Sequence, residues 1–301
     1  MARIYTLLFF VMAVWGFNLS ALVVLVNSIE PITLTAARIF LAGIAVLVIT
    51  KLLGIFRLPT KNEWKTILII TIFNVAFHHT FLALGLTRTS GVNAGIILGA
   101  APLVTMVLSI IILRDRISRL RALGFLLGFI GILTTSLAGA EGLEAVSIGD
   151  LMIFLSMFMQ AFSFILISKL NPTFDPRLLT GYMLLVGSVF IFIISCILEG
   201  DLTQLTQLFT WKLGSIFLFS AIIATAFGHM IYNFAIKNVG PTETTIFVNL
   251  NTLFALLGAS LFLGEPIMKN HYIGLVFILV GVFIGSGTVE YLIRKRRLKS
   301  R

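Results

Sequence analysis

Ten long apolar segments constrain this 301-residue chain more than any other feature of its sequence. They cover residues 4–27, 32–53, 66–86, 92–113, 119–139, 148–169, 178–198, 212–236, 242–263 and 271–293, and short polar clusters separate them. A helix needs roughly 20 mostly apolar residues to cross about 30 Å of hydrocarbon, and these segments have about that length. None of the polar clusters is long enough to form a folded soluble domain. The sequence therefore predicts an integral membrane protein.

Helix is the secondary structure that these segments predict. Backbone polar groups in lipid must bond to one another, so membrane spans are helices or closed β-barrels. Barrel strands alternate between polar and apolar residues over about 10 positions, whereas these segments are apolar on all sides and about twice as long. Charged residues make up 11% of the chain, against about 25% in soluble domains. The predicted fold class is an all-α integral membrane protein with ten transmembrane helices.

The first segment shares some features with a signal peptide, because Arg3 precedes a long apolar run. This run exceeds the usual length of a signal sequence, and no convincing small-residue cleavage site follows it. We therefore expect a retained helix. The single cysteine, Cys196, excludes a disulfide framework.

The basic residues predict the orientation in the membrane. With the N-terminus placed inside, 18 of the 22 Lys and Arg residues fall on the inner side, three fall on the outer side, and Arg38 lies within a span. The positive-inside rule then places both termini in the cytoplasm and predicts a multi-pass protein of the plasma membrane. The basic tail over 294–301 is expected to lie against anionic lipid headgroups rather than on nucleic acid.

The two halves of the chain resemble each other at a spacing near 150 residues. Matched positions are Asp115 with Glu265, Gly124 with Gly274, and Gly131 with Gly281. We divide the chain into a first repeat over 1–140, a second repeat over 141–293 and the tail. Because five spans are an odd number, the second copy must enter the membrane with the opposite orientation. Two inverted five-helix repeats are typical of secondary transporters.

Several short motifs in this order carry a resemblance to a known family. They are Trp15-Gly16-Phe17-Asn18, Ala37-Arg38, Ala42-Gly43, Ala83-Leu84, Thr89-Ser90, Pro102 with Asp115, Gly124, Gly131, Gly149-Asp150-Leu151, Gly264-Glu265-Pro266, Gly274 and Gly281. The chain resembles the EamA family of the drug/metabolite transporter superfamily over essentially its whole length. That resemblance implies a carrier that exports or exchanges amino acids, metabolites or related small solutes. It does not imply a particular substrate.

The sequence departs from the family pattern at three places. Arg114-Asp115-Arg116 replaces a sequence similar to Gly-Glu-Pro, Gln160 stands at the aligned position of the repeat tryptophan, and Asn251-Thr252 replaces a common proline. The last two departures add polar groups to the second repeat.

Histidines are the candidates for proton coupling, because no Asp or Glu lies near the centre of a span. Histidine titrates near neutral pH, so His78, His79 or His229 would have to carry protons if protons drive transport. Asn74 and His78 share a helical face, and His229 shares one with Tyr232. These faces either line a cavity or bond to neighbouring helices, and the sequence leaves both alternatives open.

Arg38 is the one strongly charged residue inside a span. It lies about two turns from the outer end of its helix. It either attracts the carboxylate or phosphate of a solute or bonds to carbonyl groups at a helix end as part of the fold. The sequence does not decide between these two roles.

Further polar residues within spans complete the candidate substrate site, since polar groups in lipid are costly and therefore functional candidates. They are Trp15 and Asn18 in the first span, Gln160 with Ser156 and Ser163 in the sixth, and Asn249 and Asn251 with Thr245 and Thr252 in the ninth. Hydrogen bonding between helices is the alternative explanation for each group. Pro102 is predicted to kink the fourth span.

No enzyme signature, phosphate-binding loop or metal-ligand motif occurs in the sequence. We therefore predict a secondary transporter without a cofactor or metal, which moves a small solute by alternating access. A lipid-carrier flippase of the same fold and an intramembrane lipid-modifying enzyme are the alternatives. The predicted partners are a small-molecule substrate and membrane lipids. Glycines spaced four apart favour close helix packing within the monomer, with a homodimer face as the second possibility.

Overall fold

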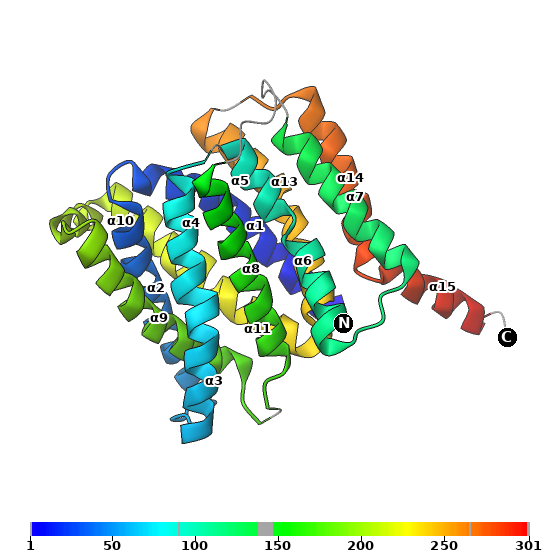
Figure 1. Cartoon of the computed structure of the whole chain (residues 1–301), viewed down its shortest axis with the longest axis horizontal. Helices are drawn as coiled ribbons and strands as arrows, with labels where there is room; N and C mark the ends of the chain where they lie inside the picture. Colours follow the sequence, from blue (N-terminus) through cyan, green and yellow to red (C-terminus); the bar gives the residue numbers. More distant parts are fainter. Residues whose placement is uncertain (1, 90, 138–146, 172, 265, 300–301) are drawn as a thin grey trace.

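The computed structural model describes residues 2–89, 91–137, 147–171, 173–264 and 266–299, and every regular element in these ranges is a helix. Nine helical spans there are long and apolar enough to cross a membrane, and a shorter apolar helix follows them. This confirms the predicted all-α membrane fold (Figure 1).

The elements of the first half are α1 (Ala2–Val26), α2 (Pro31–Leu52), α3 (Lys61–Thr71), η1 (Ile72–Phe77), α4 (His78–Leu86), α5 (Gly91–Gly99), α6 (Ala101–Leu108), η2 (Ser109–Leu113) and α7 (Arg119–Ser136). Those of the second half are α8 (Ile148–Ser168), α9 (Pro176–Leu198), η3 (Leu202–Phe209), α10 (Trp211–Leu218), η4 (Phe219–Phe227), α11 (Gly228–Val239), α12 (Pro241–Thr245), η5 (Ile246–Val248), α13 (Asn249–Gly258), η6 (Ala259–Leu263), α14 (Lys269–Gly285) and α15 (Thr288–Lys299).

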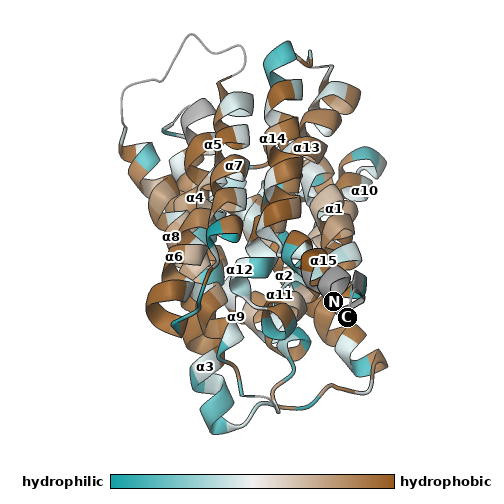
Figure 2. Ribbon diagram, turned by 90° about the vertical axis from the view of Figure 1, so that its right-hand side faces the viewer, coloured by the Kyte–Doolittle hydropathy of each residue, from teal (hydrophilic) through white to brown (hydrophobic). Residues whose placement is uncertain are grey.

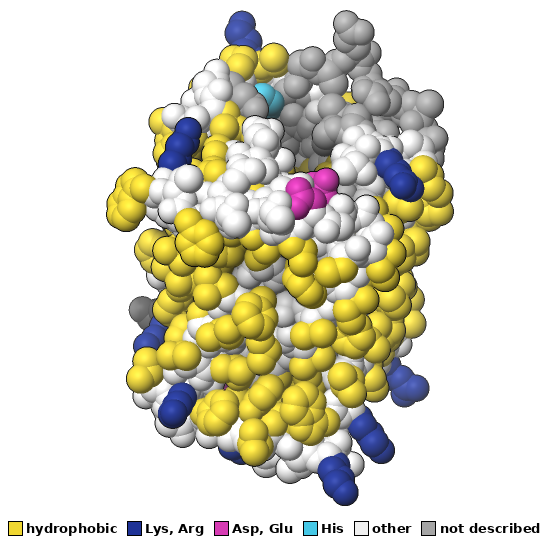
Figure 3. Space-filling view, turned by 90° about the vertical axis from the view of Figure 1, so that its left-hand side faces the viewer, with side chains coloured by type: hydrophobic (Ala, Val, Ile, Leu, Met, Phe, Trp, Pro, Cys, Tyr) yellow, Lys and Arg dark blue, Asp and Glu magenta, His cyan; other side chains and the backbone are white. Residues whose placement is uncertain are grey.

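A belt of apolar side chains surrounds the middle of the bundle. Figure 3 shows hydrophobic atoms over the central zone and Lys and Arg near the two ends. Large apolar residues such as Phe10, Ile111 and Val276 are more than half exposed, as lipid-facing residues must be because lipid is their solvent. We call the end at which α1 begins the basic end and the other the distal end. Helix α15 leads away from the bundle near the basic end, so that the two ends of the chain lie apart (Figure 1) although they overlap in the view of Figure 2.

The predicted tenth span, 271–293, is wrong at its C-terminal boundary. Helix α14 ends at Gly285, and α15 begins only at Thr288. The break occurs at Gly287, whose φ of 78° is left-handed and favours glycine. Any Cβ at this position would also meet the guanidinium of Arg121. Hydropathy does not mark this break, because apolar residues occur on both sides of it.

Irregular helical segments recur at the same places in the two halves. The π-helical segments η1 and η4 end at Phe77 and Phe227, 150 residues apart. The π-helical segments η2 and η6 are likewise 150 residues apart, and each is followed by a left-handed residue, Arg114 or Gly264. Helix α6 begins at Ala101, with Pro102 as its second residue, after a break in the helix at Ala100, which agrees with the predicted kink.

Helix packing follows the same correspondence. The most extensive contacts join α2 to α9 and α7 to α14, which are the second and fifth spans of each half paired with their counterparts. In the same way, α1 of the first span contacts α13 of the ninth. The corresponding pair is α8 of the sixth span, which contacts α6 of the fourth. The most extensive interfaces between described helices therefore join one half to the other.

Glycines bring α7 and α14 into backbone contact. A Cβ on Gly281 would lie 2.5 Å from the backbone nitrogen of Gly128, and one on Gly131 would lie 2.6 Å from the carbonyl oxygen of Gly274. Helices can approach this closely only where side chains are absent. The glycine pattern of these two spans thus serves packing within the monomer.

The N-terminus of α2 is capped by a residue from the end of α9. The Glu199 carboxylate accepts the backbone N–H groups of Ile32 and Thr33 at 2.8 and 2.7 Å, and the Thr33 hydroxyl at 2.7 Å. Ser195 then donates its hydroxyl to Thr33 at 2.6 Å. Glu199 thereby satisfies N–H groups that a helix start leaves unpaired and places a negative charge at the positive end of the helix dipole.

We expect Glu199→Ala to lower the stability of the detergent-purified protein by about 1–2 kcal/mol, the usual cost of losing a helix cap. Thermal unfolding monitored by tryptophan fluorescence measures this loss. Glu30→Gln is the matched control, because Glu30 precedes the same helix without capping it through its side chain. Equal melting temperatures for Glu199→Ala and the control would contradict the capping role.

Candidate functional site

Polar side chains from five spans meet in the middle of the bundle. They come from α1, α2, the helix formed by η1 and α4, α8, and the helix formed by η4 and α11. The predicted residues that the structure brings together here are Trp15, Arg38, Asn74, His78, His79, Gln160, His229 and Tyr232. We call this group the central cluster.

His78 is bonded at both ring nitrogens to α8. Ser156 Oγ donates to the backbone oxygen of His78 at 2.8 Å and lies 2.8 Å from Nδ1. The Gln160 side-chain amide lies 2.9 Å from Nε2. Because the serine proton is already used, Nδ1–H donates to the serine oxygen, and Nε2 accepts from the amide. His78 therefore fastens α4 to α8 as a neutral ring, which is the second of its two predicted roles.

Asn74 continues this contact one turn earlier. Its side-chain amide donates to Ser163 Oγ at 2.6 Å, and Ser163 donates to the backbone oxygen of Gln160 at 2.6 Å. The predicted polar stripe on this span thus faces α8. Ser156 and Ser163, which the sequence analysis placed only as companions of Gln160, hold it there.

Trp15, His229 and Tyr232 form an aromatic wall. The Trp15 ring centroid lies 5.1 Å from that of His229 and 5.1 Å from that of Tyr232. The indole N–H donates to the backbone oxygen of Ala224 at 2.8 Å. Gly228 makes this approach possible, because a Cβ there would collide with Trp15 Nε1. The carbonyl belongs to η4, in keeping with the frequent occurrence of π-helical turns at functional sites.

The two halves contribute to the central cluster in a corresponding way. Trp15 of the first span contacts His229 of the eighth, and Gln160 of the sixth span contacts His78 of the third. His79 lies between these pairs, with its ring centroid 4.6 Å from His78 and 6.4 Å from His229. Gln160, at the aligned tryptophan position, therefore takes the place in the second half that Trp15 takes in the first.

Within the central cluster, Arg38 lies beside the aromatic wall and bonds to η4. Its Nη1 donates to Thr225 Oγ1 at 2.8 Å, and Thr225 donates to the backbone oxygen of Ser220 at 2.8 Å. Nε of Arg38 has no hydrogen-bond partner in the described part of the chain. The structure records no bond from Arg38 to a helix-end carbonyl among those residues. Thr225 is thus the side chain that orients Arg38.

Three further polar atoms of the central cluster are buried without a hydrogen-bond partner among the described residues. They are Oδ1 of Asn74, Nε2 of His79 and the hydroxyl oxygen of Tyr232. Trp15, Gln160 and His229, in contrast, are only half-buried although they lie inside the bundle. The cluster therefore offers free donors and acceptors next to accessible side chains.

Three predicted site residues, Asn18, Asn249 and Asn251, have no recorded contact with the central cluster among the described residues. Asn249 packs against Gly128 of α7. Asn18 and Asn251 each have a buried side-chain oxygen without a partner in the described chain. The π-helical segments, which supply the carbonyl oxygens of Ala224 and Ser220, were not predicted, and no simple sequence pattern marks them.

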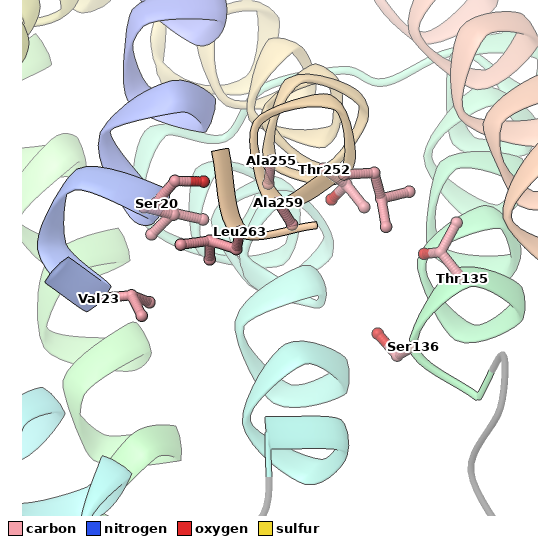
Figure 4. Close-up of a pocket in the computed structure, with 10 residues that line it drawn as sticks. Ser20, Val23, Thr135, Ser136, Thr252, Ala255, Ala259 and Leu263 are labelled. Carbon is pink, nitrogen blue, oxygen red and sulfur yellow. The ribbon is translucent and has the colours of Figure 1, made fainter. Parts of the chain in front are cut away.

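A cavity opens in the distal half of the bundle. It has a volume of about 280 Å³ and is lined by residues of α1, α7, α13 and η6, among them Ser20, Thr135, Thr252 and Ala259 (Figure 4). The fourth and ninth spans are the least buried of the candidate spans. Their distal parts, α5 and α13, are not packed closely together in the described residues.

The basic end, in contrast, is closed. There α12 packs on α6, so that the fourth and ninth spans meet. Arg121 of α7 binds Glu243 of α12 and, through Nε at 3.0 Å, Glu290 of α15. Ser118 also binds Glu290. This network joins both halves to the last helix at one end of the bundle only.

Comparison with known proteins identifies the family. The profile of the EamA-like transporter family matches residues 2–137 and again 147–286. The chain belongs to the EamA-like transporter family. Helix α15 (Thr288–Lys299) lies outside both matches, and the bounds of the two repeats stay a prediction. The family assignment makes this EamA-like protein a membrane transporter and not an enzyme.

Relatives of this EamA-like transporter occur in bacteria and archaea. The "Uncharacterized transporter YyaM" of Bacillus subtilis is 27% identical, with 92% of this chain and 84% of the relative covered. An "Uncharacterized transporter" of Archaeoglobus fulgidus is 25% identical, with 90% and 94% covered. A solved structure titled "Crystal structure of protein" has a TM-score of 0.73 at 16% identity and covers 95% of this chain and 98% of its own. That likeness supports the fold alone.

Proposed function

We propose that this transporter exports or exchanges a small polar or amphipathic metabolite by alternating access of two inverted five-helix repeats. The observation that carries the proposal is the asymmetry of the bundle: the corresponding helices of the two halves meet at the basic end and separate at the distal end. Exchange of the two halves' conformations would close the distal end and open the basic end around the same central cluster. In this conformation the bundle is open at its distal end and closed at its basic end.

We further propose that the basic end faces the cytoplasm and that the membrane is the plasma membrane. The distribution of Lys and Arg supports this orientation by the positive-inside rule. The solute would bind at the central cluster, between the pair of Trp15 with His229 and the pair of Gln160 with His78. His79 and His229 are the better candidates for proton coupling, because His78 is committed to α8.

Transport across the membrane of reconstituted liposomes tests the proposed function. Purified protein is reconstituted, the vesicles are loaded with labelled amino acids or other metabolites, and efflux is measured with and without a pH gradient. We expect saturable efflux or exchange of at least one solute. Lack of saturable flux for every solute, together with a lipid-modifying activity, would contradict the carrier function.

Closure of the basic end can be tested separately. In a Cys196→Ser background, Thr105→Cys places a thiol at a buried position of α6, the helix that contacts α12. We expect Arg121→Gln to speed labelling of this thiol from the basic end about fivefold. Losing roughly 1 kcal/mol of ion-pair energy shifts a two-state population by that factor. Reaction with a membrane-impermeant maleimide measures the rate.

The control for this experiment is Arg57→Gln. Arg57 forms a bidentate pair with Glu63 at the same end, at 2.5 and 2.7 Å, but both residues belong to α3 and the loop before it. Breaking that local pair should leave labelling unchanged. If Arg121→Gln labels no faster than the control, the network does not hold the basic end closed.

A further inference from the structure

Arg38 is a buried cation without an acidic partner in the described part of the chain. The residue is 7% exposed. The ion pairs recorded among the described residues join Arg57 to Glu63, Arg121 to Glu243 and Glu290, and Arg177 to Asp175, and none involves Arg38. The one hydrogen-bond partner recorded for its guanidinium is the neutral hydroxyl of Thr225. A charge in this position is costly unless something pairs with it.

The surroundings of Arg38 hold it beside the aromatic wall. Arg38 and Trp15 bond to consecutive residues of η4, Thr225 and Ala224. His229 lies one turn after Thr225, and its ring contacts that of Trp15 at an interplanar angle of 48°. The guanidinium is therefore fixed at one side by Thr225, next to half-buried aromatic rings. Its Nε–H is buried and has no acceptor in the described chain, so this donor of the guanidinium is unused.

We propose that Arg38 binds the carboxylate of the solute and that the aromatic wall holds the rest of that molecule. This inference rests on the proposed carrier function and names the class of substrate. A guanidinium and a carboxylate form paired, charge-assisted hydrogen bonds. One negative charge balances the single cation, whereas a phosphate dianion would leave an excess charge. A solute with only an amine would add a second positive charge beside Arg38.

The stability of the protein without solute gives the first test. If Arg38 is unpaired until a solute anion binds, Arg38→Met removes an unpaired buried charge. The melting temperature of this variant should then be higher than that of the wild type in detergent buffer free of carboxylates. A structural Arg38, needed to hold α2 on η4, predicts the opposite. A melting temperature of Arg38→Met at or below that of the wild type would overturn the proposal.

Ligand binding gives the second test. Thermal shifts and equilibrium binding are measured with a panel of small monocarboxylates, each paired with its amide, for example L-leucine with L-leucinamide and benzoate with benzamide, and with inorganic phosphate. We expect at least one monocarboxylate to bind the wild type about tenfold or more tightly than its amide. Arg38→Met should abolish this difference, and Arg38→Lys should retain part of it.

The results also separate this inference from the proposed function. Saturable flux of an amide or amine that survives Arg38→Met would overturn the carboxylate site while leaving a carrier. Carboxylate binding that depends on Arg38, without flux in liposomes, would support the site and contradict the carrier. A panel in which no carboxylate exceeds its amide, or in which phosphate alone binds, would overturn the inference.

Discussion

Gly281→Ala is expected to destabilise the protein by about 1–3 kcal/mol or more and to reduce the amount of folded protein in the membrane. The added methyl group would lie 2.5 Å from the backbone nitrogen of Gly128 and 2.7 Å from the carbonyl oxygen of Gly124. Backbone atoms cannot rotate away as a side chain can, so α7 and α14 would have to separate. Thermal unfolding in detergent and size-exclusion chromatography measure the effect.

Gly95→Ala is the matched control for this substitution. A Cβ on Gly95 would meet only the side chain of Ser136, with its oxygen 3.0 Å away, and that side chain can adopt another rotamer. The two variants have the same helix propensity change, so their difference reports the backbone contact alone. Similar melting temperatures for the two variants would show that α7 and α14 do not depend on the glycine contact.

Gly228→Ala is expected to reduce transport while leaving the fold intact. A methyl group at this position would collide with Trp15 Nε1 and displace the indole from the Ala224 carbonyl oxygen. Loss of that hydrogen bond alone, about 1 kcal/mol, corresponds to roughly fivefold weaker stabilisation of the aromatic wall. We expect the initial rate of solute flux in liposomes to fall at least about fivefold, with a normal elution profile in detergent.

Two variants control for this experiment. Trp15→Phe removes the indole N–H but keeps an aromatic ring, and should produce a similar loss if the hydrogen bond matters. Phe227→Leu alters the neighbouring residue, which is 37% exposed and faces away from the buried cluster, and should leave flux unchanged. Flux by Gly228→Ala equal to that by Phe227→Leu would exclude the aromatic wall from transport.

The few polar residues of the central cluster serve both to hold the helices together and to offer groups for contact with a solute. Most of them satisfy one another across helices: Asn74 with Ser163, His78 with Ser156 and Gln160. These bonds fix the third span to the sixth. The atoms left without a partner among the described residues, on Arg38, Asn74, His79 and Tyr232, are then the candidates for contact with a solute. Structural and binding roles are thus divided among residues that look alike in the sequence.

Hydropathy alone determined the membrane fold, because each residue's preference for lipid is local and sums along a span. It located nine spans closely, whereas the π-helical segments η1 and η4, which recur 150 residues apart, were not predicted. It also identified most members of the central cluster, since a polar residue in a span is costly wherever it stands. The predicted end of the tenth span was wrong because the break at Gly287 is not visible as a change in mean hydropathy.

Only the tertiary structure decided what each polar group touches. The sequence left Arg38 between two roles and the histidines between cavity and helix contact, because helical periodicity specifies a face but not the neighbour on that face. The partners of His78 lie 78 and 82 residues away, and that of Arg38 lies 187 residues away. Glu199, which caps α2 from the far end of α9, could not be assigned from sequence for the same reason. Solvation of the chain is local and readable from its residues, whereas the pairing of its polar groups depends on how the two halves pack.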